Sequence, residues 1–194
     1  PTRRSSDLPY NIKENYNDAD IIFITHNHYD HFSIEDIKKC IKDDTVLVII
    51  VDLEDKIKGL CSNTIVVLPN NYYSIGDISF ETVPSYNIDK HFHPIENNWV
   101  GYIINYDDLR YYIAGDTDIT EEDKNVKCDV AFLPIGGTYT MNHEEAALLA
   151  NIIRPKYVVP VHYGTIVGTI DDAVSFKERV DSNINCVILK KYKV

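Results

Sequence analysis

A histidine-rich segment at the end of an apolar run limits what this chain can fold into more than any other feature. The run Ile-Ile-Phe-Ile indicates a buried β-strand, and residues 25–32 follow it directly as Thr-His-Asn-His-Tyr-Asp-His-Phe. Side chains two positions apart in extended backbone point the same way, so His26 and His28 can bind one divalent ion such as Zn²⁺. Asp30 and His31 follow at once and are placed to hold a second ion. The alternative is a chance histidine-rich loop, although three of the seven histidines fall here.

Two later segments add candidate ligands, each after another strand-like run. Gly115-Asp116-Thr117 follows Tyr-Ile-Ala, and His162-Tyr163-Gly164 follows Val-Val-Pro-Val. Asp116 has a second interpretation, because Gly-Asp-Thr is ordinary turn chemistry in which Asp accepts hydrogen bonds from nearby amides. His162 also fits a half-buried histidine with a single hydrogen bond. The upstream histidine segment favours a ligand role for both.

The combination of H-x-H-x-D-H, a later Gly-Asp and a late histidine, each after a strand, resembles the metallo-β-lactamase superfamily. Residues 83–87, 92–94 and 133–141 resemble the branch that contains ascorbate-6-phosphate lactonase and many metal-dependent hydrolases. The pattern alone supports an α/β fold with a mixed sheet. The resemblance implies a four-layer αβ/βα sandwich, with its usual first β-hairpin missing from this chain.

The resemblance also implies a role for each motif residue. His26 and His28 bind a first ion, whereas Asp30, His31 and His162 bind a second, and Asp116 bridges the two. Many relatives place a third histidine for the first ion just after the strand that ends here at residue 83, where this chain has Ser-Tyr-Asn.

The displaced third histidine leaves a choice among the remaining histidines. We expect His93 to replace it, with His91 as the reserve candidate. If neither binds, the first site is weaker or the enzyme works with one metal. His143 lies in the first turn of a predicted helix and is expected to be exposed rather than a ligand.

The predicted activity is hydrolysis of a small-molecule ester, lactone or phosphoester by a metal-bound hydroxide. The ions are expected to be two Zn²⁺, with Mn²⁺ or Fe²⁺ as alternatives, and Asp30 is the predicted catalytic group that orients the water or takes its proton. Tyr139, in a Gly-Gly-Thr-Tyr stretch, is a candidate for substrate binding, although a plain turn explains that stretch equally well. Other interpretations are a non-catalytic metal-binding domain or inactive fragment, a nuclease, and a diiron oxidoreductase, which typically has Glu in place of His28.

Composition narrows the possible partners and location. The formal charge of −11 disfavours binding to nucleic acid, because an acidic surface repels phosphate. No apolar run approaches the roughly 18–20 residues that a membrane helix needs. The four cysteines are widely spaced, which indicates reduced thiols and a cytoplasmic protein. The expected partner is a small-molecule substrate, and the oligomeric state is not predicted.

A chain of 194 residues that is 44% hydrophobic is predicted to form one domain. Residues 1–8, Pro-Thr-Arg-Arg-Ser-Ser-Asp-Leu, resemble the translation of a common sequencing adapter. We therefore expect them to be an assembly artefact, and the hydrolase domain to comprise residues 9–194 as an N-terminally truncated fragment.

Periodicity predicts alternating strands and helices. The antiparallel second sheet is expected where strands follow one another with little helix between them, and Asp107-Asp108 is expected to be a turn there. Predicted strands are 21–25, 45–51, 63–68, 78–83, 100–105, 109–114, 130–133, 157–161 and 186–189. Predicted helices are 33–42, 53–60, 142–153 and 172–180. The first begins with Ser33 as its N-cap, and the third begins with a capping box.

Overall fold

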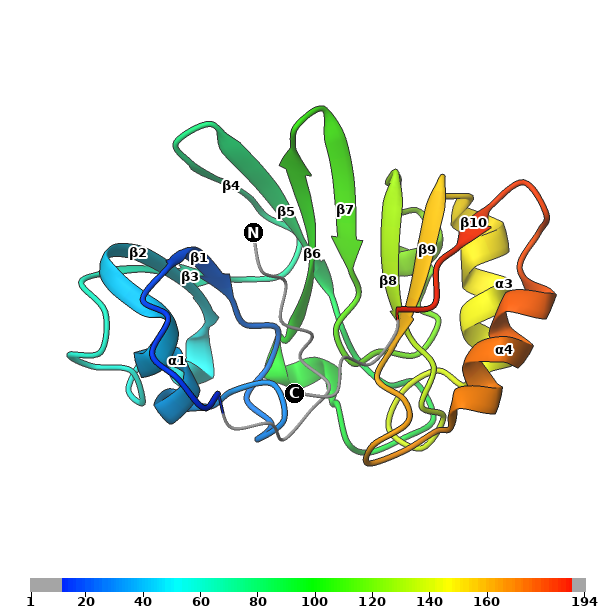
Figure 1. Cartoon of the computed structure of the whole chain (residues 1–194), viewed down its shortest axis with the longest axis horizontal. Helices are drawn as coiled ribbons and strands as arrows, with labels where there is room; N and C mark the ends of the chain where they lie inside the picture. The colour runs from blue at the N-terminus through cyan, green and yellow to red at the C-terminus, as the bar shows by residue number, and fades with distance from the viewer. Residues whose placement is uncertain (1–11, 190–194) are drawn as a thin grey trace.

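The computed structural model describes residues 12–189 (Figure 1), so the adapter prediction for residues 1–8 lies outside the described residues. Two sheets form the interior. The first has the strand order β1-β2-β3 and the second the order β10-β9-β8-β7-β6-β5-β4. The strands are β1 (Ala19–Phe23), β2 (Ile41–Ile50), β3 (Asn63–Val67), β4 (Tyr72–Ile75), β5 (Ile78–Pro84), β6 (Val100–Tyr106), β7 (Leu109–Ile113), β8 (Val130–Pro134), β9 (Tyr157–Val161) and β10 (Asn185–Cys186). The helices are α1 (Ile34–Cys40), α2 (Glu121–Lys124), α3 (His143–Ile153) and α4 (Ile170–Arg179), with 3₁₀ turns η1 (Val51–Leu53) and η2 (Ile95–Asn97).

The three-stranded sheet is parallel throughout, with β2 in the middle. The last residues of β2, Leu-Val-Ile-Ile, are fully buried, as expected for a central parallel strand that is covered on both faces. The Ser33 side chain accepts a hydrogen bond from the Asp36 amide and so caps α1. Helix α1 packs its buried Ile37 into the same core.

The seven-stranded sheet is mixed. Strands β4 to β7 pair antiparallel and β7 to β10 pair parallel. Asp107 and Asp108 have φ values of 51° and 58°, which is the left-handed backbone that a tight two-residue hairpin requires. Helices α3 and α4 lie beside β8 to β10 on the outer side of this sheet (Figure 1).

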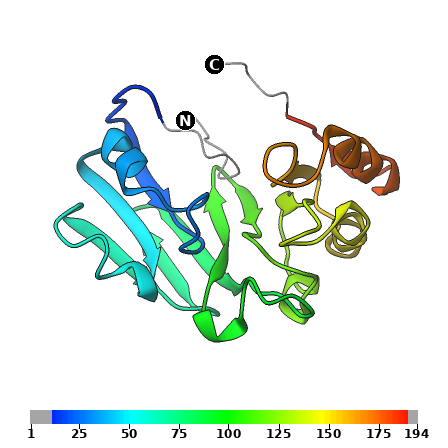
Figure 2. The same cartoon turned by 90° about the horizontal axis from the view of Figure 1, so that it is seen from below.

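Two apolar clusters hold the layers together. One joins the two sheets and includes Leu47, Phe80 and Tyr102. The other joins the seven-stranded sheet to α3 and α4, and it includes Leu133, Leu149 and Phe176, among others. The order helix, sheet, sheet, helix (Figure 2) confirms the predicted four-layer α/β sandwich.

Several sequence-based boundaries were wrong. In place of the helix predicted for 53–60, η1 is followed by turns in which Lys56 and Leu60 make i→i−3 hydrogen bonds and Ile57 makes an i→i−4 bond. The left-handed φ of 78° at Gly59 is incompatible with a helix at that residue. The helix predicted to reach residue 42 ends at Cys40, since β2 begins at once. The strand predicted for 186–189 shrinks to Asn185–Cys186, whereas β4 and α2 were not predicted at all.

The direction of the strands brings several loops to one edge. Since β6 is antiparallel to both β5 and β7, the C-terminal ends of β5, β7, β8 and β9 all lie at the edge where β6 begins. The end of β1 meets the same place, because the Val100 amide donates to the Thr25 carbonyl at 3.1 Å. The Tyr102 hydroxyl also donates to the Ile24 carbonyl at 2.6 Å. Among residues 12–189, no helix is both long and apolar enough to cross a membrane.

A buried carboxylate supports the loop between β7 and β8. Asp123 and Thr120 form a reciprocal capping box at the start of α2, and the Tyr112 hydroxyl donates to the other Asp123 oxygen. Burial raises the pKa of Asp123 to about 6, although the hydrogen bonds from Tyr112 and Thr120 act in the opposite direction.

This raised pKa predicts a pH-dependent stability difference. The protonated carboxyl favours the folded state below the unfolded pKa of 3.8, and that contribution is lost as the pH rises through about 6. Asp123→Asn mimics the protonated form, so wild type should lose roughly 1–3 kcal/mol relative to the variant between pH 4 and pH 7. Urea unfolding of both proteins across this range measures the difference, and a constant difference would contradict the assigned pKa.

Candidate metal centre

The loop after β1 positions the first four candidate ligands. The amides of His31 and Phe32 both donate to the His28 carbonyl, at 3.0 and 2.9 Å, which folds the loop back on itself. This turn places the ring of His31 with its centroid 3.9 Å from that of His26. His26 is buried, whereas His28 and Asp30 are half-buried.

Asp116 comes from the loop after β7. Gly115 precedes it with a φ of 70°, a left-handed conformation that glycine adopts without strain. The Ser85 hydroxyl, just after β5, donates to the Asp116 carbonyl at 3.1 Å. The Thr117 hydroxyl donates to the Tyr86 carbonyl at 3.1 Å. These bonds fix the position of Asp116 between neighbouring strand ends.

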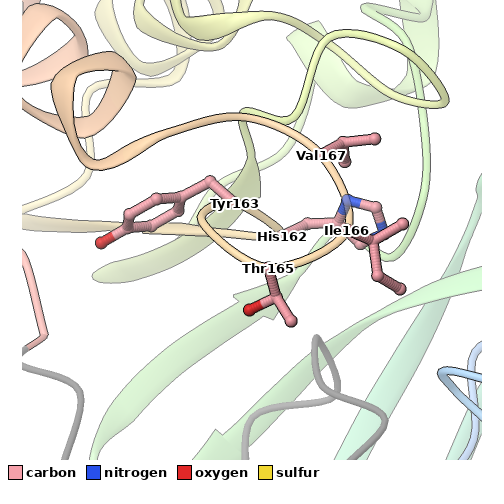
Figure 3. Close-up of a pocket in the computed structure, with 5 residues that line it drawn as sticks. All are labelled: His162, Tyr163, Thr165, Ile166 and Val167. Carbon is pink, nitrogen blue, oxygen red and sulfur yellow. The ribbon is translucent and has the colours of Figure 1, made fainter.

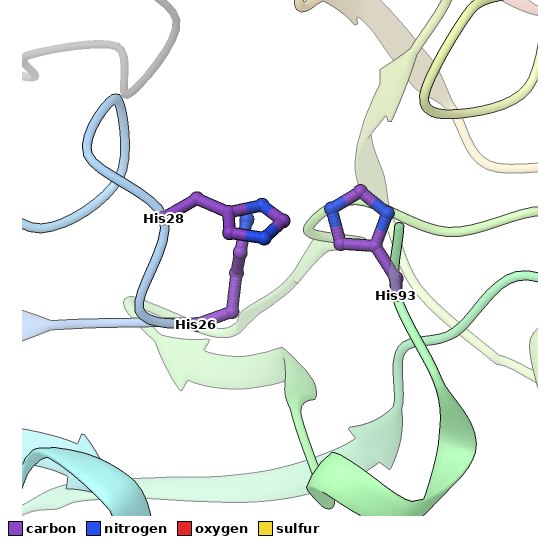
Figure 4. A group of neighbouring side chains, drawn as sticks. All are labelled: His26, His28 and His93. Atoms are coloured by element: carbon purple, nitrogen blue, oxygen red, sulfur yellow. The ribbon is translucent and has the colours of Figure 1, made fainter. Parts of the chain in front are cut away.

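Three histidines form a first group, which Figure 4 shows converging from two loops. His26, His28 and His93 each offer a ring nitrogen, and these atoms lie within 4.8 Å of one another. The indole of Trp99 packs beside all three rings at centroid distances of 4.8–5.5 Å. Its Nε1 donates to Asp52 at 3.1 Å.

A second group combines Asp30, His31 and His162 under the same 4.8 Å limit. The Oδ2 atom of Asp30 lies 3.5 Å from Nε2 of both His31 and His162. His162 has a φ of 57°, a left-handed conformation that is uncommon for a residue with a side chain. Such strain often accompanies a functional position.

Asp116 lies between the two groups. Its carboxylate oxygens are 3.8 Å from Nε2 of His26, and 3.3, 3.3 and 3.2 Å from Nε2 of three further histidines, His31, His93 and His162. Burial alone would raise the pKa of Asp116, but the surrounding His31, His162 and His93 rings outweigh it and hold the pKa well below its usual range.

The histidines differ in charge preference. Burial and the neighbouring His31 lower the pKa of His26 well below its usual range, so the ring of His26 is neutral and able to donate a lone pair. Burial and His93 lower the pKa of His28 as well. Burial opposes charge on His31 too, but Asp116 and Asp30 raise the pKa of His31 to about 9.

These residues fit a divalent cation. Within residues 12–189, the buried Nε2 atoms of His26 and His93 have no hydrogen-bond partner, although both lie near the ionised Asp116 carboxylate. A buried polar atom without a partner costs about 1–3 kcal/mol, and a metal ion would supply that partner. Imidazole and carboxylate donors in two groups of three suit Zn²⁺, and also Mn²⁺ or Fe²⁺.

The structure brings together all seven residues that the sequence predicted as metal ligands, in the predicted grouping: His26, His28, Asp30, His31, His93, Asp116 and His162. Their binding of ions stays a prediction. The reserve candidate His91 is exposed and belongs to none of these groups. His143 is also outside them, with its Nδ1 3.1 Å from Asp172.

Tyr139, the predicted substrate contact, packs its ring edge-on against Phe92 with centroids 4.6 Å apart. Sequence reasoning missed two residues that touch the first group, Trp99 and Asn87. The single tryptophan of the chain and an asparagine at the position of the displaced histidine were the available signals.

The position of His162 depends on close packing with Gly136. Figure 3 shows a small pocket, lined by residues 162, 163 and 165–167, into which the His162 ring turns. A Cβ atom added at Gly136 would lie only 2.6 Å from the His162 carbonyl oxygen and 2.6 Å from the Val167 side chain. Only glycine therefore fits beside His162.

Comparison with known proteins places these motifs in a family context. A model of the Beta-lactamase superfamily domain matches residues 2–162. A UPF0173 metal-dependent hydrolase of Thermococcus onnurineus is 31% identical over 89% of this chain and 80% of the relative. Another from Pyrococcus horikoshii is 31% identical over 91% of this chain and 81% of the relative.

Solved structures agree with these relatives. This structure resembles the crystal structure of a protein from Parabacteroides distasonis with a TM-score of 0.74. The two chains are 36% identical, and the match covers 89% of this chain and 77% of the other. Igni18, a metallo hydrolase of the archaeon Ignicoccus hospitalis, also has a TM-score of 0.74, at 26% identity over 88% of this chain and 76% of its own.

The Gly136 packing predicts a specific mutational effect. Gly136→Ala should displace His162, lower stability by about 1–3 kcal/mol through overpacking, and weaken metal binding. Gly59→Ala is the control, because Gly59 has a φ of 78° and open space around its Cβ position, so it costs backbone strain alone. Thermal unfolding and metal titration of both variants separate the two effects. Equal metal affinity of Gly136→Ala and Gly59→Ala would contradict the prediction.

Proposed function

Because this chain belongs to the metal-dependent hydrolases of the β-lactamase superfamily, we propose that it hydrolyses a small-molecule ester, lactone or phosphoester with two divalent ions. His26, His28 and His93 would hold one ion, and Asp30, His31 and His162 would hold the other. Asp116, which lies between the two groups, would contribute to both. Zn²⁺ is the preferred ion for this donor set.

One observation carries this proposal. A single buried carboxylate, Asp116, has the Nε2 atoms of four histidines within 3.8 Å, and these histidines come from the loops after three different strands, β1, β5 and β9. A purely structural carboxylate needs one or two partners, whereas a bridging ligand needs donors on both sides. Ions bound here would lower the pKa of a coordinated water and polarise the bond to be cleaved.

Asp30 is the group that orients the attacking water. Burial alone would raise the pKa of Asp30, but hydrogen bonds with His162 and His31 lower it below its usual range, so the carboxylate is ionised at neutral pH. A carboxylate of low pKa is a weak base, and orientation is therefore its main contribution. Asp30 is only half-buried, so solvent reaches its carboxylate.

Three other functions are less well supported. A diiron oxidoreductase typically carries Glu at the position of His28, which here lies with His26 and His93 in an all-histidine group. A nuclease would need a basic surface for phosphate, but the chain carries a formal charge of −11. A non-catalytic metal-binding domain would use the same candidate ligands, so a turnover assay is needed to distinguish it from a hydrolase.

Metal analysis tests the dinuclear site directly. Purified protein loaded with Zn²⁺ or Mn²⁺ and then dialysed should retain close to two ions per chain by elemental mass spectrometry. His26→Ala should remove one of them, because it takes a ligand from the first group. A wild-type protein that retains no metal after loading would refute the proposal.

Turnover tests the chemistry. We expect a screen of lactones, phosphodiesters and phosphorylated sugars to identify a substrate whose hydrolysis needs metal. His26→Ala and Asp116→Ala should each lower kcat/KM at least about 100-fold. His91→Ala is the matched control, since His91 is an exposed histidine two residues from His93 and should leave turnover unchanged. Undiminished turnover in both site variants would contradict the mechanism.

A further inference from the structure

The side chain of Asn87 joins two loops next to the first histidine group. It lies just after β5, is 7% exposed, and packs against His93, which is 1% exposed. The Asn87 amide nitrogen Nδ2 donates to the Tyr139 carbonyl at 3.0 Å. Its oxygen Oδ1 accepts from the main-chain amide of His93 at 3.1 Å, and the Asn87 main-chain amide donates to the His93 carbonyl at 2.8 Å.

These partners fix the orientation of the Asn87 amide. The Tyr139 carbonyl can only accept a hydrogen bond, so Nδ2 must face it. The His93 main-chain amide can only donate, so Oδ1 must face it. The opposite orientation would place the Nδ2 donor against the donor of the His93 amide, and the Oδ1 acceptor against the acceptor of the Tyr139 carbonyl.

The orientation of Asn87 in turn fixes the proton on His93. Nδ1 of His93 lies 2.9 Å from the same Oδ1 oxygen, which is an acceptor and requires a protonated Nδ1. A neutral imidazole has one ring proton, so Nε2 then carries a bare lone pair. This Nε2 is 3.3 Å from Oδ2 of Asp116, and it has no hydrogen-bond partner among the described residues.

His26 lacks such a constraint. Its Nδ1 lies 2.9 Å from the Thr25 hydroxyl, which can donate or accept and so permits either tautomer. Of these two histidines, only His93 therefore has a tautomer that its hydrogen-bond partners determine. Figure 4 shows the ring of His93 turned toward those of His26 and His28.

We infer that Asn87 is a positioning residue, whose Oδ1 holds the proton of His93 on Nδ1 and so presents a bare Nε2 to the ion shared with His26 and His28. The inference rests on the proposed function for the role of that ion. The hydrogen bond between Oδ1 of Asn87 and Nδ1 of His93 also holds the His93 ring in one orientation. Outer partners of this kind typically change metal affinity 10–100-fold when they are removed.

The tautomer of His93 is measurable without metal or substrate. Long-range ¹H–¹⁵N NMR of metal-free wild-type protein at alkaline pH, with the signal assigned from a His93→Gln variant, should show a protonated Nδ1 and a bare Nε2. A wild-type His93 with its proton on Nε2 overturns the inference.

The effect on the ion is measurable with Co²⁺ as the probe. Trp99 is the only tryptophan of the chain and lies 4.8–5.5 Å from the three rings, so the quenching of its fluorescence reports Co²⁺ bound near these rings. Asn87→Leu removes the acceptor and keeps the branching at Cγ, and it should mix the His93 tautomers and weaken Co²⁺ binding about 10–100-fold. Asn87→Asp loses the donor to the Tyr139 carbonyl but keeps an acceptor for Nδ1, so His93 should still hold its proton on Nδ1 in this variant.

Thr82→Val is the matched control for lost stability. Thr82 is also buried, and its hydroxyl donates to the Leu68 carbonyl at 2.6 Å, away from the histidines. This variant should lower the thermal midpoint and leave the Co²⁺ dissociation constant unchanged. Equal Co²⁺ affinity of wild type and Asn87→Leu, or an Asn87→Asp variant in which His93 carries its proton on Nε2, overturns the inference.

The two proposals fail in different ways. If wild-type protein binds no Co²⁺ but His93 holds its proton on Nδ1, the metal-binding function fails and the tautomer assignment stands. If Co²⁺ binds equally well with and without the Asn87 oxygen, the function stands and the role of Asn87 fails.

Discussion

A buried, ionised carboxylate in the midst of imidazole rings is the constraint on which the rest of the structure depends. Asp116 is 3% exposed, and a charge so far from water is costly unless other groups compensate it. Its histidine neighbours supply part of that compensation, and His31 takes a raised pKa as a result. The Nε2 atoms of His26 and His93 have no hydrogen-bond partner among the described residues, and a divalent cation would supply one.

The direction of the strands brings the histidines close to Asp116. Candidate ligands separated by more than 130 residues, from His26 to His162, meet because β5, β7, β8 and β9 end at the edge where β6 starts and β1 stops. Hydrogen bonds between the loops then position the side chains: Ser85 holds the backbone of Asp116, and Asn87 joins His93 to the backbone of Tyr139. Glycine at 136 leaves space for the strained backbone of His162.

Local sequence predicted the regular elements where periodicity and capping agreed. The strand Tyr157–Val161 and the helix His143–Ile153, with its Asn142 capping box, matched the expected positions. Prediction failed where the local signal conflicted with chain geometry. Leu53 and Ile57 have helical spacing and are both buried, yet they lie in turns that Gly59 ends. The edge strand β4 alternates exposed and half-buried residues and depends on pairing with β5, which no local pattern reveals.

The sequence by itself predicted the candidate ligands, because residues 25–32, Asp116 and His162 each follow a strand-like run and carry few other interpretations in combination. It did not decide between His91 and His93, since two alternate positions in an irregular loop have no periodicity that tells inward from outward. The tertiary structure separates the two positions: Asn87 closes the loop on His93 with backbone and side-chain hydrogen bonds, so His93 is buried beside His26 and His28 and His91 is exposed. Trp99 and Asn87 became part of the site for the same reason, because their contacts with the histidines exist only once the strands are paired.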